Sequence, residues 1–178
     1  MKSERTSKPV IGYLGTVDDR IDVDLIKYLS DIFPNSTIRF VGRILSERVF
    51  SELQQYENIE FTGPQAPEEL PVLLRSFDIG LIPFVKSTFT KGIYPLKINE
   101  YLAAGLPVVL TEFADLEEFN DIASICSTHH HFAEAVRREL MADSFSRRER
   151  RQKEAEKNSW KSRVVELTTI LEQVKDRA

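Results

Sequence analysis

The chain contains a single cysteine, Cys126, which excludes a disulfide within it and fits a reducing compartment. No apolar run approaches the roughly 20 residues that a membrane-spanning helix requires. Residues 1–9 are polar and lack the apolar centre of a signal peptide, so we expect them to form an exposed linker. Acidic residues outnumber basic ones by 28 to 24, and the net charge of −4 disfavours a nucleic-acid partner. These absences favour a cytoplasmic protein.

Two familiar signatures are also missing. Gly12-Tyr-Leu-Gly15 follows a strand candidate, but it is not the Gly-x-Gly-x-x-Gly fingerprint of dinucleotide-binding domains, so a hydride-transfer enzyme is disfavoured. The three consecutive histidines at 129–131 do not predict a metal site, because neighbouring side chains on a helix point about 100° apart. We expect a polar first helical turn there and no bound metal, and we expect Cys126 to be a buried thiol.

Apolar strand candidates alternate with amphipathic helix candidates along the chain. The predicted strands cover residues 10–14, 37–41, 59–61, 78–82, 107–110 and 122–126. Helices between them are expected to begin near Asp22, Ser46, Pro67, Pro95 and Thr128. This alternation predicts an α/β fold in which a doubly wound, Rossmann-like parallel sheet of about six strands has helices on both faces. The length of 178 residues corresponds to one domain.

Candidate ligand groups follow the predicted strands. Sheets of this kind bind ligands beyond the carboxyl ends of their strands, where the strand order reverses. Gly15-Thr16, Gly42-Arg43, Gly63-Pro64 and Pro83 each follow a predicted strand, and residues 87–95 continue from the fourth. The loops that contain them are therefore predicted to converge on one rim.

Residues 92–110 read as a loop, a short helix, a glycine stop and a buried strand. Pro95 suits the first helical turn, and Gly105 suits a left-handed cap. A loop that enters a helix N-terminus offers free N–H groups and a positive partial charge to an anion. Glu100 lies too far inside the helix for that role. A carboxylate at its position is better suited to accept hydrogen bonds from sugar hydroxyls.

The segment Lys97-x-x-Glu-Tyr-Leu-Ala-Ala-Gly-Leu-Pro-Val-Val resembles the donor-site signature of GT-B glycosyltransferases of the large retaining "group one" family. It is most similar to members that build capsule, teichuronic acid or exopolysaccharide chains. The resemblance implies that Glu100 holds the ribose of the nucleotide. Gly92 stands eight residues earlier, where the family has a first Glu that contacts the donor sugar.

The cations that neutralise the diphosphate in this family are also replaced. Thr16 stands where an Arg is expected after the first strand, and no lysine follows at the usual distance. Arg20, Arg43 and Lys97 are the available substitutes. Arg43 is favoured among the arginines because it follows Gly42 at a strand end, and Lys97 could reach the phosphates from the first helical turn.

The resemblance implies a nucleoside diphosphate sugar as substrate, with UDP or GDP as the nucleotide, and no metal or other cofactor. The implied nucleotide site comprises Gly15, Thr16, Arg43, Gly63, Pro64, Pro83, Ile93, Tyr94, Lys97 and Glu100. The implied donor sugar and phosphate loop comprises Thr88, Thr90, Lys91 and Gly92. We expect Tyr94 and Tyr101 to be mainly packing residues, with Tyr94 at the edge of the loop.

A full enzyme of this family has two such domains with the active site between them. The chain is long enough for one, so we expect the donor-binding, carboxy-terminal half, at residues 10–145. The catalytic residues are expected in an amino-terminal domain that is missing here. The expected partners are that domain, the donor, and a polysaccharide or lipid-linked acceptor. A nucleotide-sugar epimerase half and a non-catalytic interaction module that kept the fold remain alternatives.

Residues 146–178 differ in character and are predicted to form C-terminal helices that pack on the same domain. The run from Arg147 to Lys153 has five cations and one acid. A solvated helix face explains it, while peripheral contact with the inner face of a membrane is the alternative. Beyond Trp160 an apolar ladder follows at Val164, Leu167, Ile170, Leu171 and Val174.

Overall fold

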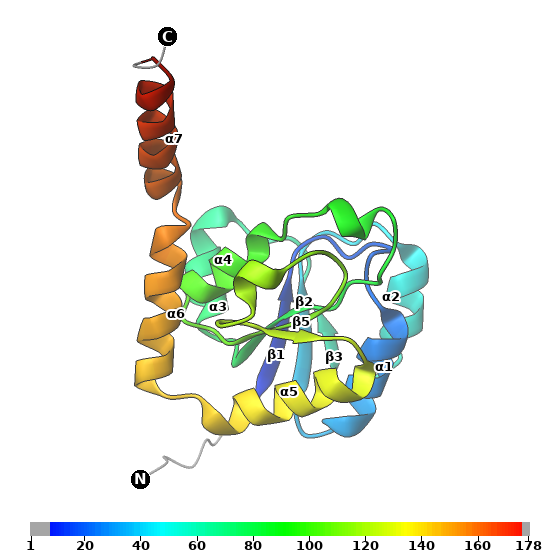
Figure 1. Cartoon of the computed structure of the whole chain (residues 1–178). Coiled ribbons are helices and arrows are strands. Elements are labelled where there is room, and N and C mark those ends of the chain that lie inside the picture. The colour runs from blue at the N-terminus through cyan, green and yellow to red at the C-terminus, as the bar shows by residue number, and fades with distance from the viewer. Residues whose placement is uncertain (1–7, 176–178) are drawn as a thin grey trace.

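The computed structural model describes residues 8–175, which form a parallel six-stranded sheet between helices (Figure 1). The strand order is β3-β2-β1-β4-β5-β6 and every pairing is parallel. The strands are β1 (Val10–Leu14), β2 (Thr37–Val41), β3 (Ile59–Phe61), β4 (Ile79–Ile82), β5 (Val108–Thr111) and β6 (Ser124–Cys126). The order reverses between β1 and β4, so the predicted doubly wound fold is confirmed and its switch point lies there.

The helices cover both faces of the sheet (Figure 1). They are α1 (Val23–Ile32), α2 (Glu47–Leu53), α3 (Leu70–Leu74), α4 (Leu96–Ala103), α5 (His129–Ala142), α6 (Phe145–Lys157) and α7 (Trp160–Lys175). Short 3₁₀ turns span Pro67–Glu69, Thr90–Gly92 and Glu117–Phe119. Helices α1 and α5 pack together on one face, and α4 and α6 pack together on the other.

Local sequence signals determine where the helices begin and end. Asp22, Ser46 and Thr128 are N-caps, as predicted, and each side chain accepts a hydrogen bond from the backbone N–H three residues later. Pro95 occupies the N-cap position of α4, one place before the position expected. Gly105 follows α4 with φ +77°, a left-handed conformation that any other residue would adopt only with strain.

The core lies between the sheet and its two helical layers. The largest fully buried side chains include Tyr13, Phe40, Tyr101, Phe113 and Phe132. Burial of a side chain of this size stabilises the fold by about 1.5–3 kcal/mol relative to leaving it exposed. Cys126 is buried as predicted, and burial raises the pKa of its thiol to about 11.

The two C-terminal helices, α6 and α7, differ in whether they pack against the rest of the domain. Helix α6 packs against α4, where Arg151 Nε donates to the carbonyl oxygen of Gly105 at 2.8 Å. Helix α7 extends beyond α6 and away from the sheet (Figure 1). Its apolar side chains at Val164, Val165, Leu167 and Ile170 are exposed. The structure therefore differs from the expectation that both helices pack on the domain. Within residues 8–175, no helix is long and apolar enough to cross a membrane.

Candidate functional site

Backbone hydrogen bonds join the three loops at the carboxyl ends of β1, β2 and β3. The N–H of Gly15 donates to the carbonyl of Val41 at 2.8 Å, and the N–H of Gly42 donates to that of Gly63 at 3.0 Å. A Cβ on Gly42 would lie 2.1 Å from the carbonyl oxygen of Gly15. Glycine is therefore required at the rim because the loops approach too closely for side chains.

The loops after β1 and β4 also pair with each other across the switch point. The N–H of Asp22 donates to the carbonyl of Pro83 at 2.8 Å, and the N–H of Val85 donates to that of Arg20 at 2.7 Å. Pro83 is buried in this pairing. The Pro83 ring is buried because two loops distant in sequence meet here, and its contact with the nucleotide stays a prediction.

Lys97 is the cation that the structure places at the end of β1. A Cβ on Gly15 would lie 2.2 Å from Cε of Lys97 and 2.8 Å from its Nζ, so the side chain crosses directly over the glycine. Burial lowers the pKa of this ammonium group; Glu100 opposes that effect and Arg20 adds to it. Gly15 and Lys97, both predicted site residues, are thus brought together.

Arg20 is the second cation near this point. Its guanidinium donates to Asp18, with Nε 2.8 Å from Oδ1 and Nη2 2.7 Å from Oδ2, and lies 5.0 Å from the ring centroid of Phe84. The charges of Arg20 and Asp18 both influence Lys97. Arg43 is exposed, and within residues 8–175 it forms no ion pair. Its role, which sequence reasoning favoured over that of Arg20, stays a prediction.

Glu100 is exposed on α4 and borders a pocket of about 450 Å³. The pocket lining is mostly apolar and comes from the end of β1, the 3₁₀ turn Pro67–Glu69, α3 and the end of α4: Leu14, Pro67, Leu70, Pro71, Leu74, Ala103 and Ala104. Arg75 and Gln152 add polar groups to the lining. A carboxylate beside an apolar pocket can accept hydrogen bonds from hydroxyl groups while a flat ring lies against the apolar wall. Sequence reasoning missed this wall because its leucines occupy ordinary core positions.

Thr90 is buried within the loop in which the resemblance implies a contact with the donor. It is fully buried, its Oγ1 donates to the carbonyl of Val85 at 2.7 Å, and the same atom accepts from the N–H of Ser87 at 2.9 Å. The hydroxyl is thus occupied in holding the loop together. Thr90 therefore shapes the loop, and a direct contact between Thr90 and the donor stays a prediction.

The remaining loop residues face solvent. Thr88 and Lys91 are exposed and border a second pocket, of about 850 Å³, together with Lys86 and Glu112. Gly92 is exposed, and a Cβ added there would meet no atom within 4 Å. The structure therefore has room for a side chain at the position where the resemblance implies a Glu.

The other predicted residues have mixed surroundings. Ile93 is half-buried against the core, and Tyr94 is 41% exposed with its ring 6.0 Å from that of Phe119. Thr16 is half-buried, and its carbonyl accepts a hydrogen bond from the Tyr13 hydroxyl at 2.8 Å. Gly63 has φ +70°, and Pro64 beside it is exposed.

His129 forms a polar contact at the same rim. Its Nε2 lies 2.9 Å from Oδ2 of Asp22, so the first turns of α1 and α5 are linked. The ring centroids of His130 and His131 lie 6.2 Å apart in an edge-to-face arrangement. In the part of the chain that the structure describes, no three histidine, cysteine or carboxylate side chains are placed to hold a metal ion.

Sequence comparison matches most of the α/β domain to one family. A family model described as glycosyl transferases group 1 matches residues 8–142. TuaH of Bacillus subtilis strain 168, whose name describes a teichuronic acid biosynthesis glycosyltransferase, is 36% identical over 104 residues, which are 57% of this chain and 26% of TuaH.

Solved structures share the fold at low sequence identity. HepE from Anabaena, in complex with UDP and glucose, matches 95% of this chain with a TM-score of 0.67 and 17% identity. A UDP-forming trehalose-phosphate synthase from Burkholderia vietnamiensis matches 96% with a TM-score of 0.70 and 14% identity. The matches cover 48% and 46% of those two chains. The chain thus spans about a quarter of TuaH and under half of each solved structure.

Proposed function

The chain belongs to the group 1 glycosyl transferases, and on that basis we propose that it is the nucleotide-sugar-binding domain of a glycosyltransferase. One observation carries the proposal. On α4, Glu100 borders an apolar pocket, and Lys97, one helical turn earlier, reaches the glycine at the end of β1. Residues three apart on a helix lie about 5–6 Å from each other at Cβ. A ribose and its diphosphate require two such neighbouring sites.

Each part of a nucleoside diphosphate has a matching group. The base would lie in the apolar pocket between Leu14 and Leu70, with the ribose hydroxyls donating to Glu100. The diphosphate would lie against Lys97 and the N-terminus of α4, where the free N–H groups and the helix dipole favour an anion. Arg20 would add positive charge from the loop after β1.

The same groups would assist sugar transfer. When the bond between sugar and diphosphate breaks, negative charge develops on the leaving diphosphate. A partly desolvated Lys97 and a fixed helix N-terminus would stabilise that charge without reorganising. We propose retaining transfer that needs no metal. The chain alone would bind nucleotide and transfer no sugar, because the catalytic residues would come from a second domain.

The nucleotide and the partners are proposed from the relatives. HepE is in complex with UDP, and the Burkholderia enzyme is UDP-forming, so we propose UDP in preference to GDP. The similarity to TuaH supports a polysaccharide or lipid-linked acceptor at the inner face of a membrane. Peripheral membrane contact and a cytoplasmic location stay predictions. Membership of this family favours transfer over the epimerase alternative.

A binding titration tests the proposal. The chain is titrated with UDP, GDP and ADP by calorimetry or ligand-observed NMR, and the titration is repeated with Glu100→Gln. Loss of the ribose hydrogen bonds to a charged acceptor should weaken UDP binding about tenfold. Glu57→Gln is the matched control, because Glu57 is also exposed but precedes β3 at the opposite edge of the sheet. Failure of all three nucleotides to bind at millimolar concentration would contradict the proposal.

A further inference from the structure

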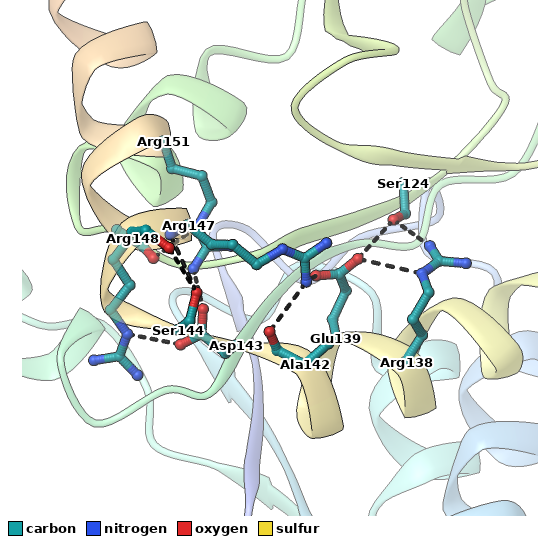
Figure 2. Close-up of polar contacts among 11 residues, drawn as sticks. Ser124, Arg138, Glu139, Ala142, Asp143, Ser144, Arg147, Arg148 and Arg151 are labelled. Carbon is teal, nitrogen blue, oxygen red and sulfur yellow. Dashed lines mark hydrogen bonds and ion pairs between the residues drawn. The ribbon is translucent and has the colours of Figure 1, made fainter.

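Four arginines line a cavity of about 280 Å³ where α5 meets α6, which we name the arginine pocket. Figure 2 labels three of them, Arg138, Arg147 and Arg151. The arginine pocket lies against Val108 and Ser124, the first residues of β5 and β6, and is therefore at the opposite edge of the sheet from the nucleotide site. Its charged lining comprises Arg138, Arg147, Arg150, Arg151, Glu139 and Asp121. Nothing in the proposed function uses these residues.

One buried carboxylate serves two of the arginines. Glu139 is only 8% exposed, and its carboxylate lies 3.5 Å from Arg138 and 3.2 Å from Arg147. Ser124 accepts a further hydrogen bond from Arg138 at 2.9 Å (Figure 2). The side chains of Arg138 and Arg147 are 58% and 43% exposed, so both keep donors that face solvent. One negative charge therefore balances two positive charges.

A second carboxylate, one helical turn further along the chain, also pairs with two arginines. Asp143 pairs with Arg148 at 2.6 Å and also with Arg151, which is 4% exposed and holds the end of α4. Arg150 is exposed and donates Nη2 to the carbonyl oxygen of Asp121 at 3.0 Å. Within residues 8–175, Arg150 forms no ion pair. The junction of α5 and α6 therefore carries more positive charge than the carboxylates of Glu139 and Asp143 neutralise.

We propose that the arginine pocket binds a phosphate group, either free or as the phosphodiester of a lipid headgroup. Guanidinium groups present paired N–H donors that match phosphate oxygens, and Arg138, Arg147 and Arg150 converge on the cavity from two helices. A bound phosphate would relieve the repulsion among these cations. Two apolar side chains at the junction of α5 and α6, Met141 and Phe145, are 65% and 77% exposed. They are suited to contact the acyl region when the phosphate belongs to a lipid.

Inorganic phosphate is the first probe. The 178-residue chain, labelled with nitrogen-15, is titrated with phosphate and separately with sodium chloride at equal ionic strength. We expect saturable NMR shifts at residues that line the arginine pocket with phosphate only. Arg138→Gln and Arg150→Gln should each weaken binding about tenfold, the effect of losing a charge-assisted hydrogen bond. Arg137→Gln is the matched control, since Arg137 adjoins Arg138 on α5 but pairs with Glu134 outside the pocket.

Vesicles distinguish the two sources of phosphate. The chain is sedimented with phosphatidylcholine vesicles that contain or lack phosphatidylglycerol. Binding to the anionic vesicles that requires Arg138 and Arg150 would assign the pocket to a lipid headgroup, and phosphate binding without vesicle binding would assign it to a free phosphate. The proposal is overturned if neither probe binds, or if Arg137→Gln weakens binding as much as the two pocket variants do.

Discussion

The hydroxyl of Tyr101 accepts a hydrogen bond from the backbone N–H of Leu14 at 2.8 Å and lies 3.3 Å from the carbonyl oxygen of Leu81, to which it donates. A fully buried phenol from α4 thus joins the carboxyl ends of β1 and β4 at the point where the strand order reverses. Its ring lies over Gly80, where a Cβ would come within 2.5 Å of it. Tyr101 therefore positions the helix that carries Lys97 and Glu100.

Tyr101→Phe should destabilise the fold by about 1–3 kcal/mol, because it leaves a buried N–H of Leu14 without an acceptor. Urea unfolding followed by circular dichroism measures the change. Tyr56→Phe is the control, since the half-buried Tyr56 hydroxyl makes no hydrogen bond within residues 8–175 and its loss should change the free energy of unfolding little. Equal stabilities for the two variants would show that the Tyr101 hydroxyl does not anchor α4.

Lys97→Met should separate phosphate recognition from nucleoside recognition. We expect UDP binding to weaken about tenfold or more through loss of a charge-assisted contact, and uridine binding to change little. Glu100→Gln should weaken both ligands, because both carry the ribose. Paired titrations of the two variants with UDP and uridine measure the difference. If Lys97→Met weakened UDP and uridine equally, the lysine would not contact the diphosphate.

The lowered pKa of Lys97 affects both the stability of the fold and the pH dependence of UDP binding. Its folded pKa lies below its unfolded value, so the charged form opposes folding at neutral pH and this opposition fades as pH rises through the folded pKa. Lys97→Met should therefore unfold at a higher urea concentration than the wild type at pH 7. UDP affinity of the wild type should decline at a lower pH than the ordinary lysine value of 10.5. A decline only above that value would contradict the burial argument.

Local signals predicted much of the fold. The caps at Asp22, Ser46 and Thr128 depend on side chains that bond within one helical turn, so the sequence alone identifies them. The strands were predicted to within two residues at each end because buried apolar runs are short and bounded by turn residues. The course of α7 was not predictable in this way, since an apolar ladder indicates a helix with an apolar face but not whether the same domain covers that face.

The candidate site residues were predictable where one sequence motif, the segment that begins at Lys97, contains them. Lys97 and Glu100 were identified from one segment, and the structure places both at the switch point. Loop position suggested that Thr90 and Pro83 are exposed, but the structure buries both. Hydrogen bonds within its own loop hold Thr90, whereas Pro83 is held by pairing with a loop distant in sequence. The apolar wall that includes Leu70 was missed for the converse reason, because its pocket forms only when α3 and α4 come together.

Asp143→Asn should destabilise the chain by roughly 3 kcal/mol at pH 7, since it removes the buried partner of Arg151. Burial raises the pKa of Asp143, but hydrogen bonds from Arg151 and Arg148 outweigh that effect and hold the pKa below its usual 3.8. The stabilisation is thus complete above 3.8 and is lost as pH falls through the lower folded value. Urea unfolding at several pH values should show that the free energies of unfolding of the wild type and of Asp143→Asn converge at acidic pH. Asp31→Asn serves as the control, because Asp31 is exposed. A difference in the free energy of unfolding between the wild type and Asp143→Asn that does not depend on pH would contradict the ion-pair argument.

Gly92→Glu should add affinity for the sugar part of the donor. A side chain fits without clash, because a Cβ at Gly92 meets no atom within 4 Å, and a carboxylate there would stand where the family resemblance implies a contact with the donor sugar. Relative to UDP, binding of a UDP-hexose should improve about tenfold through new hydrogen bonds from sugar hydroxyls to a charged acceptor. Thr88→Glu places the same charge in the same exposed loop and should not reproduce the effect. If both variants weakened UDP and UDP-hexose alike, the carboxylate would act only by repelling the diphosphate, and the sugar would lie elsewhere.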